Sequence, residues 1–268
     1  MKADLLDHGY VRMVSYTQPA ERGAACSREA SGPPVHDDDH FSRIGDAWTG
    51  DLEIVRAARV SHNADWRPEK AKAGTMDAPP QSKDEKLIHY LWKNKHTSPF
   101  EAMTFSFEVQ APIFVFRQWH RHRTQSYSEV SARYTELPDI FYVPDPKLVG
   151  QQSSKNKQAR VLMETDGPDP NAEAFCEFIR MNSEEAHDEY KSFLELGIPR
   201  ELARLALPVN VYSRMYATAN LLNWFRFISL RTDPHAQYEI RIYAEAMLNM
   251  LGTVCPIAVN AFKESHIG

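Results

Sequence analysis

The hydrophobic positions of this chain repeat with two different periods, and each period predicts a different kind of element. The run AMTFSFEV (102–109) alternates strictly, because Met103, Phe105 and Phe107 share one face while the residues between them are polar. Successive side chains of a strand point to opposite faces, so this run predicts a strand with one face in a core. Residues 2–16 alternate more loosely and predict a first strand near the N-terminus.

Several longer runs place apolar residues three and four positions apart, which is the spacing of one helical face. Asp51 is suited to cap the first of these helices, Gly197 to end the longest, and Asp233-Pro234 to start the last. The helices predicted in this way cover 52–61, 85–95, 112–122, 172–196, 200–207, 220–230 and 235–251.

The order of the predicted elements indicates the fold class. The strands lie in the first half of the chain and the second half is mostly helical, so we expect an α+β fold. A length of 268 residues fits one large domain or two small ones. Three stretches rich in Pro, Gly, Ser and Asp interrupt the pattern, and we predict loop insertions near 17–47, 63–82 and 145–172.

Composition and charge narrow the class of partner. The chain is 43% hydrophobic and 25% charged, as in a globular protein, and its net charge of -5 argues against a nucleic-acid partner. No apolar run approaches the roughly 20 residues that span a bilayer, so we expect no membrane partner. The N-terminus has acidic residues where a signal peptide would have an apolar core. Three scattered cysteines, Cys26, Cys176 and Cys255, argue against a disulfide framework, and we predict a cytoplasmic protein.

One segment, RHRTQSYSEVSARY (121–134), follows neither period. It gathers three arginines among hydroxyl side chains, and the helix before it adds Arg117 and Gln118. Guanidinium groups donate hydrogen bonds in pairs to phosphate and carboxylate oxygens. The segment therefore predicts a pocket for a small anionic ligand, and a solvated surface loop is the alternative.

Two histidine patterns raise the question of a metal site, and we predict none. HDDDH (36–40) lies in an acidic loop without a second ligand cluster, and His120 and His122 diverge on a helix between arginines that repel a cation. The glycines form neither a dinucleotide turn nor a P-loop, and no nucleophile elbow occurs. The residues alone indicate an α+β protein with an arginine-lined pocket for phosphorylated small molecules.

The cationic segment also resembles the R-H-R-x7-S signature of the flavin-dependent thymidylate synthases. Further segments resemble that family in the same order along the chain: AARVSHN, HTSPFE, QAPIFVFRQWHRHR, GIPRELARLALPVNVYSRMY and LRTDPHAQYEIR. The resemblance covers nearly all of the chain outside the three insertions, and it implies one domain over 1–268.

The resemblance implies a homotetramer with FAD in active sites where subunits meet. It implies the methylation of dUMP to dTMP, with methylenetetrahydrofolate as carbon donor and NADPH as the reductant of the flavin. The classical thymidylate synthases use a cysteine in a Pro-Cys-Gln context, and no cysteine of this chain has that context. A route without an enzyme nucleophile must polarise the pyrimidine electrostatically.

The resemblance also assigns residues to the two ligands. Arg231 would face the uracil and favour its ionisation, and His96 would lie near the substrate pocket. The residues implied for dUMP are Gln118, Arg121, Glu129, Ser131, Arg133, Arg204 and Arg231. Those implied for FAD are Ser98, Arg121, His122, Arg123, Glu129, Asn220 and Arg226.

Three positions depart from the family pattern, namely Ala102, Ser128 and Arg226, and we expect them to tune binding. Two rival interpretations remain open from the sequence. One is a flavoprotein that only oxidises NADPH, and the other is a nucleotide-binding regulator without catalysis. The complete set of dUMP residues argues against both.

Overall fold

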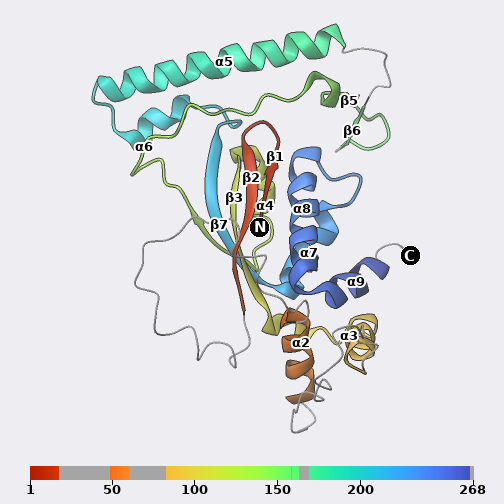
Figure 1. The fold of residues 1–268 in the computed structure, drawn as a ribbon. Helices are drawn as coiled ribbons and strands as arrows, with labels where there is room; N and C mark the ends of the chain where they lie inside the picture. The colour runs from red at the N-terminus through yellow and green to blue at the C-terminus, as the bar shows by residue number, and fades with distance from the viewer. Residues whose placement is uncertain (18–48, 61–82, 158, 163–168, 266–268) are drawn as a thin grey trace.

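An antiparallel sheet lies at the centre of the protein, between helices that pack on one of its faces and helices at its two ends (Figure 1). Its strand order is β1-β2-β3-β7-β4, so β7, from the second half of the chain, pairs with both β3 and β4. The strands are β1 (Lys2–Leu5), β2 (Gly9–Tyr16), β3 (Thr104–Pro112), β4 (Ser126–Glu129) and β7 (Tyr212–Asn220).

The structure is a computed structural model that describes residues 1–17, 49–60, 83–157, 159–162 and 169–265. Apart from residue 17, the insertions predicted near 17–47 and 63–82 lie outside the described residues, as does the HDDDH run. The third predicted insertion, 145–172, contains a short helical turn and a hairpin instead of a plain connecting loop. These are η3 (Pro146–Leu148), β5 (Gln151–Gln152) and β6 (Arg160–Val161).

The helices follow the predicted order along the chain. Helix α5 lies across one end of the sheet, while α2 and α3 lie at the other end. Helices α7 and α8 run beside the strands, and α9 packs against α8 and α3 near the α2–α3 end (Figure 1). The helices and helical turns are α2 (Thr49–Val60), α3 (Lys83–Lys93), η2 (Ser98–Ala102), α4 (Ile113–Trp119), α5 (Pro170–Glu195), α6 (Arg200–Ala203), η4 (Arg204–Ala206), α7 (Leu221–Arg231), α8 (Tyr238–Val254) and α9 (Pro256–Glu264). Within the described residues, no helix combines the length and the apolar character needed to cross a bilayer.

The alternating face of β3 forms the centre of the main core, as its pattern predicts. Phe105 and Phe107 are fully buried and pack with the apolar residues of α7, α8 and α9. Trp224 of α7 lies edge-to-face on Phe107, with 5.1 Å between ring centroids, and its indole N–H donates to the carbonyl of Phe105. This packing fixes α7 against β3 and thereby fixes the position of Arg231, the last residue of α7.

Gly197 ends α5, as the sequence predicts. Its φ of +79° lies in the left-handed region, and its N–H donates to Leu194 while the N–H of Ile198 donates to Phe193. These two bonds close the last turn of the helix.

The structure adds elements that the periodic pattern did not predict. Residues 2–16 form two paired strands joined by a turn instead of one strand. Strand β7 (Tyr212–Asn220) crosses the sheet in the half of the chain predicted to be mostly helical, and the polar segment 121–134 contributes the short edge strand β4. Helix α8 begins at Tyr238, not at residue 235, and α9 follows it from Pro256.

Candidate active site

Helix α4 follows β3 and carries polar side chains on two faces. Gln118 points toward the end of α7, and Arg117 lines a groove on the other side of the helix. Pro112 is both the last residue of β3 and the N-cap of this helix, and Val115, Phe116 and Trp119 bury its inner face. After the helix, the chain turns through 120–125. Tyr127 holds this turn, because its hydroxyl donates to the carbonyls of His122 (2.7 Å) and Trp119 (3.3 Å). The cationic segment thus begins from a fixed point.

Three of the predicted site residues, one from α4, one from the turn and one from the end of α7, form a single hydrogen-bonded cluster. Arg231 donates through Nε to His122 Nε2 at 3.0 Å. It also donates through its Nη atoms to the backbone oxygen of Gln118 at 2.9 Å and to the side-chain oxygen at 3.4 Å. We call Gln118, His122 and Arg231 the uracil cluster, after the ring that Arg231 is predicted to face.

The uracil cluster carries a positive charge without a carboxylate partner. In the described part of the chain Arg231 pairs with no acidic side chain, and burial lowers its pKa, though a guanidinium stays protonated. Burial and the neighbouring Arg231 lower the pKa of His122 to about 4, so the imidazole is neutral near pH 7 and accepts the Arg231 N–H. The field of a half-buried cation is therefore available to a ligand.

A second group of predicted residues lines one groove of about 590 Å³ beside the other face of α4. Glu129, Ser131 and Arg204 come from β4, the segment after it and η4. Arg117 and His120 also line this groove, and the hydroxyl of Ser213 donates to Glu129 at 2.8 Å. The groove thus gathers cationic and hydroxyl donors, which suit a phosphate.

Arg133 lies near this groove, because it and the groove residue Arg204 both contact Glu201. Its guanidinium pairs with the carboxylate of Glu201 at 3.3 Å, and Arg204 donates through Nε to the carbonyl of Glu201 at 3.2 Å. Both arginines are exposed, so a phosphate can compete for them. The structure thus brings Arg133 and Arg204 together from segments that are far apart in the sequence.

The remaining predicted residues do not join these two groups within one chain. Arg121 and Arg123 are exposed on the turn after α4 and, in the described part of the chain, have no carboxylate partner. Asn220 caps α7 by accepting the N–H of Asn223 at 2.9 Å. Arg226 donates to Asn223 at 3.1 Å. Two further predicted residues, Ser98 and His96, are exposed at and just before η2.

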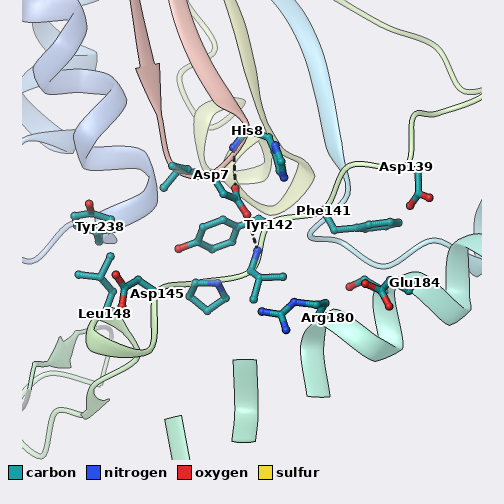
Figure 2. A pocket seen from close by; sticks show the side chains of 14 residues that line it. Asp7, His8, Asp139, Phe141, Tyr142, Asp145, Leu148, Arg180, Glu184 and Tyr238 are labelled. Atoms are coloured by element: carbon teal, nitrogen blue, oxygen red, sulfur yellow. Dashed lines mark hydrogen bonds between the residues drawn. The ribbon is translucent and has the colours of Figure 1, made fainter. Parts of the chain in front are cut away.

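A larger cavity of about 790 Å³ lies elsewhere, between the β1–β2 turn, the 139–148 segment and α5 (Figure 2). None of the predicted site residues lines it. Its wall includes the carboxylates of Asp7, Asp139, Asp145 and Glu184, and Arg180 is its one guanidinium among the described residues. An acidic wall repels a phosphate, so we assign the candidate site to the uracil cluster and the groove instead.

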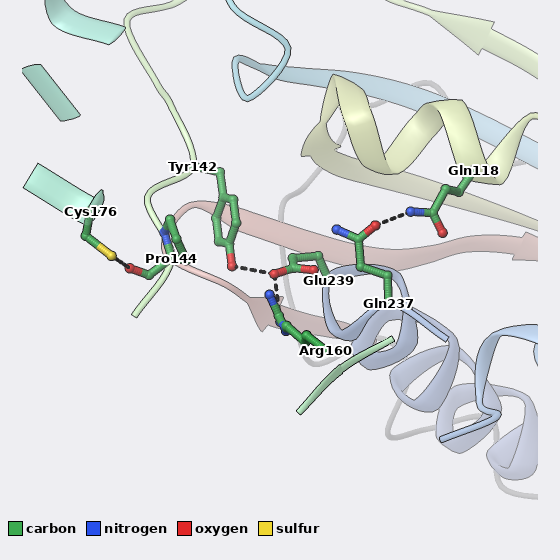
Figure 3. A network of polar contacts seen from close by, with 7 residues as sticks. All are labelled: Gln118, Tyr142, Pro144, Arg160, Cys176, Gln237 and Glu239. Atoms are coloured by element: carbon green, nitrogen blue, oxygen red, sulfur yellow. Dashed lines mark hydrogen bonds and ion pairs between the residues drawn. The ribbon is translucent and has the colours of Figure 1, made fainter. Parts of the chain in front are cut away.

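Gln237 contacts the uracil cluster and was not among the residues predicted from the sequence. Gln118 donates through its side-chain amide to the side-chain oxygen of Gln237, the residue that precedes α8 (Figure 3). Its position in the LRTDPHAQYEIR segment was the available signal, but spacing does not show which polar side chain of a loop turns inward. The sequence raises His120 only as a possible metal ligand, and its ring packs against that of Tyr127, with 4.8 Å between ring centroids.

Fold and site together define a class: an α+β protein that gathers guanidinium groups in a half-buried cluster and beside a groove, an arrangement that suits a phosphorylated ligand. The family described as thymidylate synthase complementing protein matches residues 43–257. The chain therefore belongs to this family, the flavin-dependent thymidylate synthases.

Relatives named flavin-dependent thymidylate synthase share much of the sequence. The protein of Wolbachia pipientis wMel is 43% identical over 227 residues, which cover 84% of this chain and 75% of the relative. That of Thermus thermophilus is 41% identical, over 85% of this chain and 77% of the relative.

A solved structure shares the fold. It is the UMP/dUMP methylase PolB from Streptomyces cacaoi bound with 5-Br UMP, with a TM-score of 0.71 and 31% identity over 97% of this chain and 96% of that one. The same protein bound with 5-Br dUMP matches equally, with a TM-score of 0.71.

Proposed function

We propose that this chain catalyses the reductive methylation of dUMP to dTMP without a covalent bond between the enzyme and the pyrimidine. Methylenetetrahydrofolate is the carbon donor and NADPH the reductant in this proposal. The observation that carries it is the uracil cluster, in which the charge of Arg231 is half-buried and its partners among the described residues are all neutral.

The chain's own residues account for two parts of this chemistry. The groove donors Ser131 and Arg204, with Arg133 beside them, would hold the dUMP phosphate, because charged and hydroxyl donors line the same groove. Gln118 and Arg231 would hold the ring. A fixed cation stabilises negative charge as it develops on the pyrimidine, and a half-buried site strengthens the effect. No nucleophile is then needed to activate the ring.

The exposed donors of the turn after α4 suit the cofactor. FAD carries a pyrophosphate, and Arg121 and Arg123 present two guanidinium groups that lack carboxylate partners in the described part of the chain. His122, Asn220, Ser98, Glu129 and Arg226 would complete the flavin site. When bound, the flavin supplies the hydride that converts the transferred carbon into a methyl group.

We further propose that the site is completed by other copies of the chain in a homotetramer. Four of the residues assigned to FAD, Ser98, Arg121, Arg123 and Arg226, are exposed on one copy of the chain, so a second copy would enclose the cofactor. Large apolar side chains are also exposed on one side of α5 and on the segment after it, among them Phe178 at 64%, Leu196 at 76% and Leu205 at 78%. Such a surface indicates contact with another protein surface. We place the enzyme in the cytoplasm, as its cysteine content predicts.

Two measurements test the proposed function against its rivals. The purified protein should bind FAD and show a flavin spectrum, and its expression should rescue a thymidine-requiring strain. A protein that binds flavin and oxidises NADPH but does not rescue the strain would be an oxidase of this fold. A protein that gains no flavin spectrum on addition of FAD would contradict both flavin hypotheses.

A further inference from the structure

A buried carboxylate lies next to the candidate site, and the proposed reaction does not use it. Glu239 stands in the first turn of α8 and is 2% exposed. Its Oε1 accepts the hydroxyl of Tyr142 at 3.0 Å and pairs with Arg160 at 3.0 Å (Figure 3). Burial and the neighbouring Glu239 raise the pKa of Tyr142, so its hydroxyl remains protonated and donates.

Arg160 compensates the charge of this carboxylate. It belongs to β6, in the hairpin that the sequence suggested to be an insertion, and its side chain also lies over the ring of Tyr238. The other carboxylate oxygen of Glu239, Oε2, has no hydrogen-bond partner among the described residues. Removal of one member of a buried ion pair leaves the other charge uncompensated. The surrounding structure must then move so that water can reach that charge.

The same turn of α8 holds the residue that contacts the uracil cluster. The backbone oxygen of Gln237 accepts the N–H groups of Ile240 (3.2 Å) and Arg241 (3.1 Å), so Gln237 is fixed to the turn that contains Glu239. Its side chain does not cap the helix and instead accepts the amide N–H of Gln118. A displacement of this turn therefore reaches Gln118 directly.

Gln118 transmits the displacement to Arg231. Its side-chain amide has two defined contacts, because its N–H group donates to Gln237 and its oxygen accepts from Arg231. Loss of the Gln237 contact frees the amide to rotate, and Arg231 then loses one of the acceptors that orient its guanidinium. A small misplacement of a polarising group reduces the rate of a reaction strongly.

We propose that Arg160 is a positioning residue for the uracil cluster. It acts through Glu239 and Gln237 on Gln118 and Arg231, and it does not touch the substrate itself. This inference rests on the proposed function, because it takes the uracil cluster to be the part of the site that handles the ring.

A double-mutant cycle tests this path. Arg160→Met should lower kcat/KM for dUMP by about ten-fold. In a Gln237→Ala background the same substitution should have less than about a two-fold effect, because residues that act through one another are not additive. An equal loss in both backgrounds would overturn the proposal, since a purely structural role affects stability in both. Should Arg160→Met fail to fold, Arg160→Lys takes its place in the cycle, with a smaller loss in the same pattern.

Arg241→Met is the matched control. Arg241 lies over the same Tyr238 ring, at 5.8 Å against 5.7 Å for Arg160, but it pairs with the exposed Glu245 and donates to the carbonyl of Pro234 at 3.2 Å, and it makes no ion pair with Glu239 among the described residues. Its loss should change kcat/KM for dUMP by less than about two-fold. A loss as large as that of Arg160→Met would show that the whole Tyr238 region, and not the pair with Glu239, sets the effect, and would contradict the proposal.

Hydrogen exchange separates this inference from the proposed function. The amides of Ile240 and Arg241 should exchange faster in Arg160→Met than in the wild type. They should not change in Arg59→Met, whose ion pair with Asp84 joins α2 to α3 at the far end of the sheet. Unchanged exchange in Arg160→Met would overturn the positioning role even if the enzyme is active. If Arg160→Met exchanges faster than the wild type as predicted, but the wild type never forms dTMP, only the proposed function is contradicted.

Discussion

At the scale of single residues, the proposed chemistry depends on a cation whose partners are neutral. Replacement of Arg231 by alanine should leave FAD binding intact and lower kcat for dTMP formation by about a hundred-fold to a thousand-fold, since one well-placed donor is worth about 3–4 kcal/mol in a site of this kind. Flavin absorbance measures the first quantity and steady-state turnover the second.

Arg180→Ala is the control for this prediction, because Arg180 is an exposed arginine that pairs with Glu177 on α5. It should turn over like the wild type. Full activity in Arg231→Ala would refute the polarising role, and loss of flavin from that variant would assign Arg231 to cofactor binding instead.

His122 provides a second prediction at this scale. In the unfolded chain a histidine titrates near 6.5, whereas burial and Arg231 lower the pKa of His122 to about 4 in the folded protein. As the pH falls below 6.5 the unfolded chain takes up a proton that the folded protein refuses, so this residue reduces stability increasingly down to about pH 4.

Nuclear magnetic resonance of the imidazole measures this titration directly. The His122 signal should titrate near 4 in the wild type, and in Arg231→Met its midpoint should rise toward 6.5 because one of the two causes is removed. A midpoint near 6.5 in the wild type would show that the imidazole does not accept the Arg231 N–H.

At the scale of elements, the junction between α2 and α9 makes a prediction about stability. Asp51 is 1% exposed and accepts the N–H groups of Ile257 and Ala258, both at 2.9 Å, at the start of α9. Burial is the main cause that raises its pKa to about 6, above the 3.8 of an ordinary aspartate. The folded protein therefore holds this proton more tightly than the unfolded chain.

The stabilisation from Asp51 is thus complete below about pH 3.8 and is lost as the pH rises through 6, by an amount on the order of 3 kcal/mol. Asp51→Asn cannot titrate, so the free energy of unfolding in urea should lack this decline between about pH 4 and pH 7. Parallel pH profiles for the two proteins would contradict the prediction.

Elements whose pattern is local could be predicted, and elements that depend on distant pairing could not. The alternation of β3 and the stop of α5 at Gly197 stand in the sequence itself. The buried positions of β7 are partly alanines, Ala217 and Ala219, which suit a helix as well as a strand. Strand β4 is short and polar, and its pairing with β7 makes it a strand.

At the scale of the whole molecule, the sequence suggested the chemistry of the site better than its geometry. Spacing on α4 placed Gln118 near the cationic segment, but only the family resemblance linked it to Arg204 and Arg231. The groove and the uracil cluster confirm that these segments lie near one another, while the ligand roles stay predictions. The contacts of Gln237, Glu239 and Arg160 could not be predicted, because they join three separate segments and no local pattern encodes them.

The proposed assembly yields a prediction at this scale. Phe178→Asp places a charge on the exposed apolar side of α5 and should shift the protein to smaller species in size-exclusion chromatography, with loss of turnover. Ser154→Asp adds the same charge at an exposed polar position and should leave both unchanged. A Phe178→Asp protein that elutes and turns over like the wild type would show that this surface is not an interface between copies.

The central claim is that a fixed cation and a flavin replace an enzyme nucleophile. Turnover of dUMP with methylenetetrahydrofolate and NADPH, with and without FAD, in a protein whose three cysteines are changed to serine, tests it most directly. We expect dTMP to form at close to the wild-type rate and only when FAD is present. Formation of dTMP without flavin, or its complete loss on removal of the cysteines while the protein stays folded, would contradict the claim.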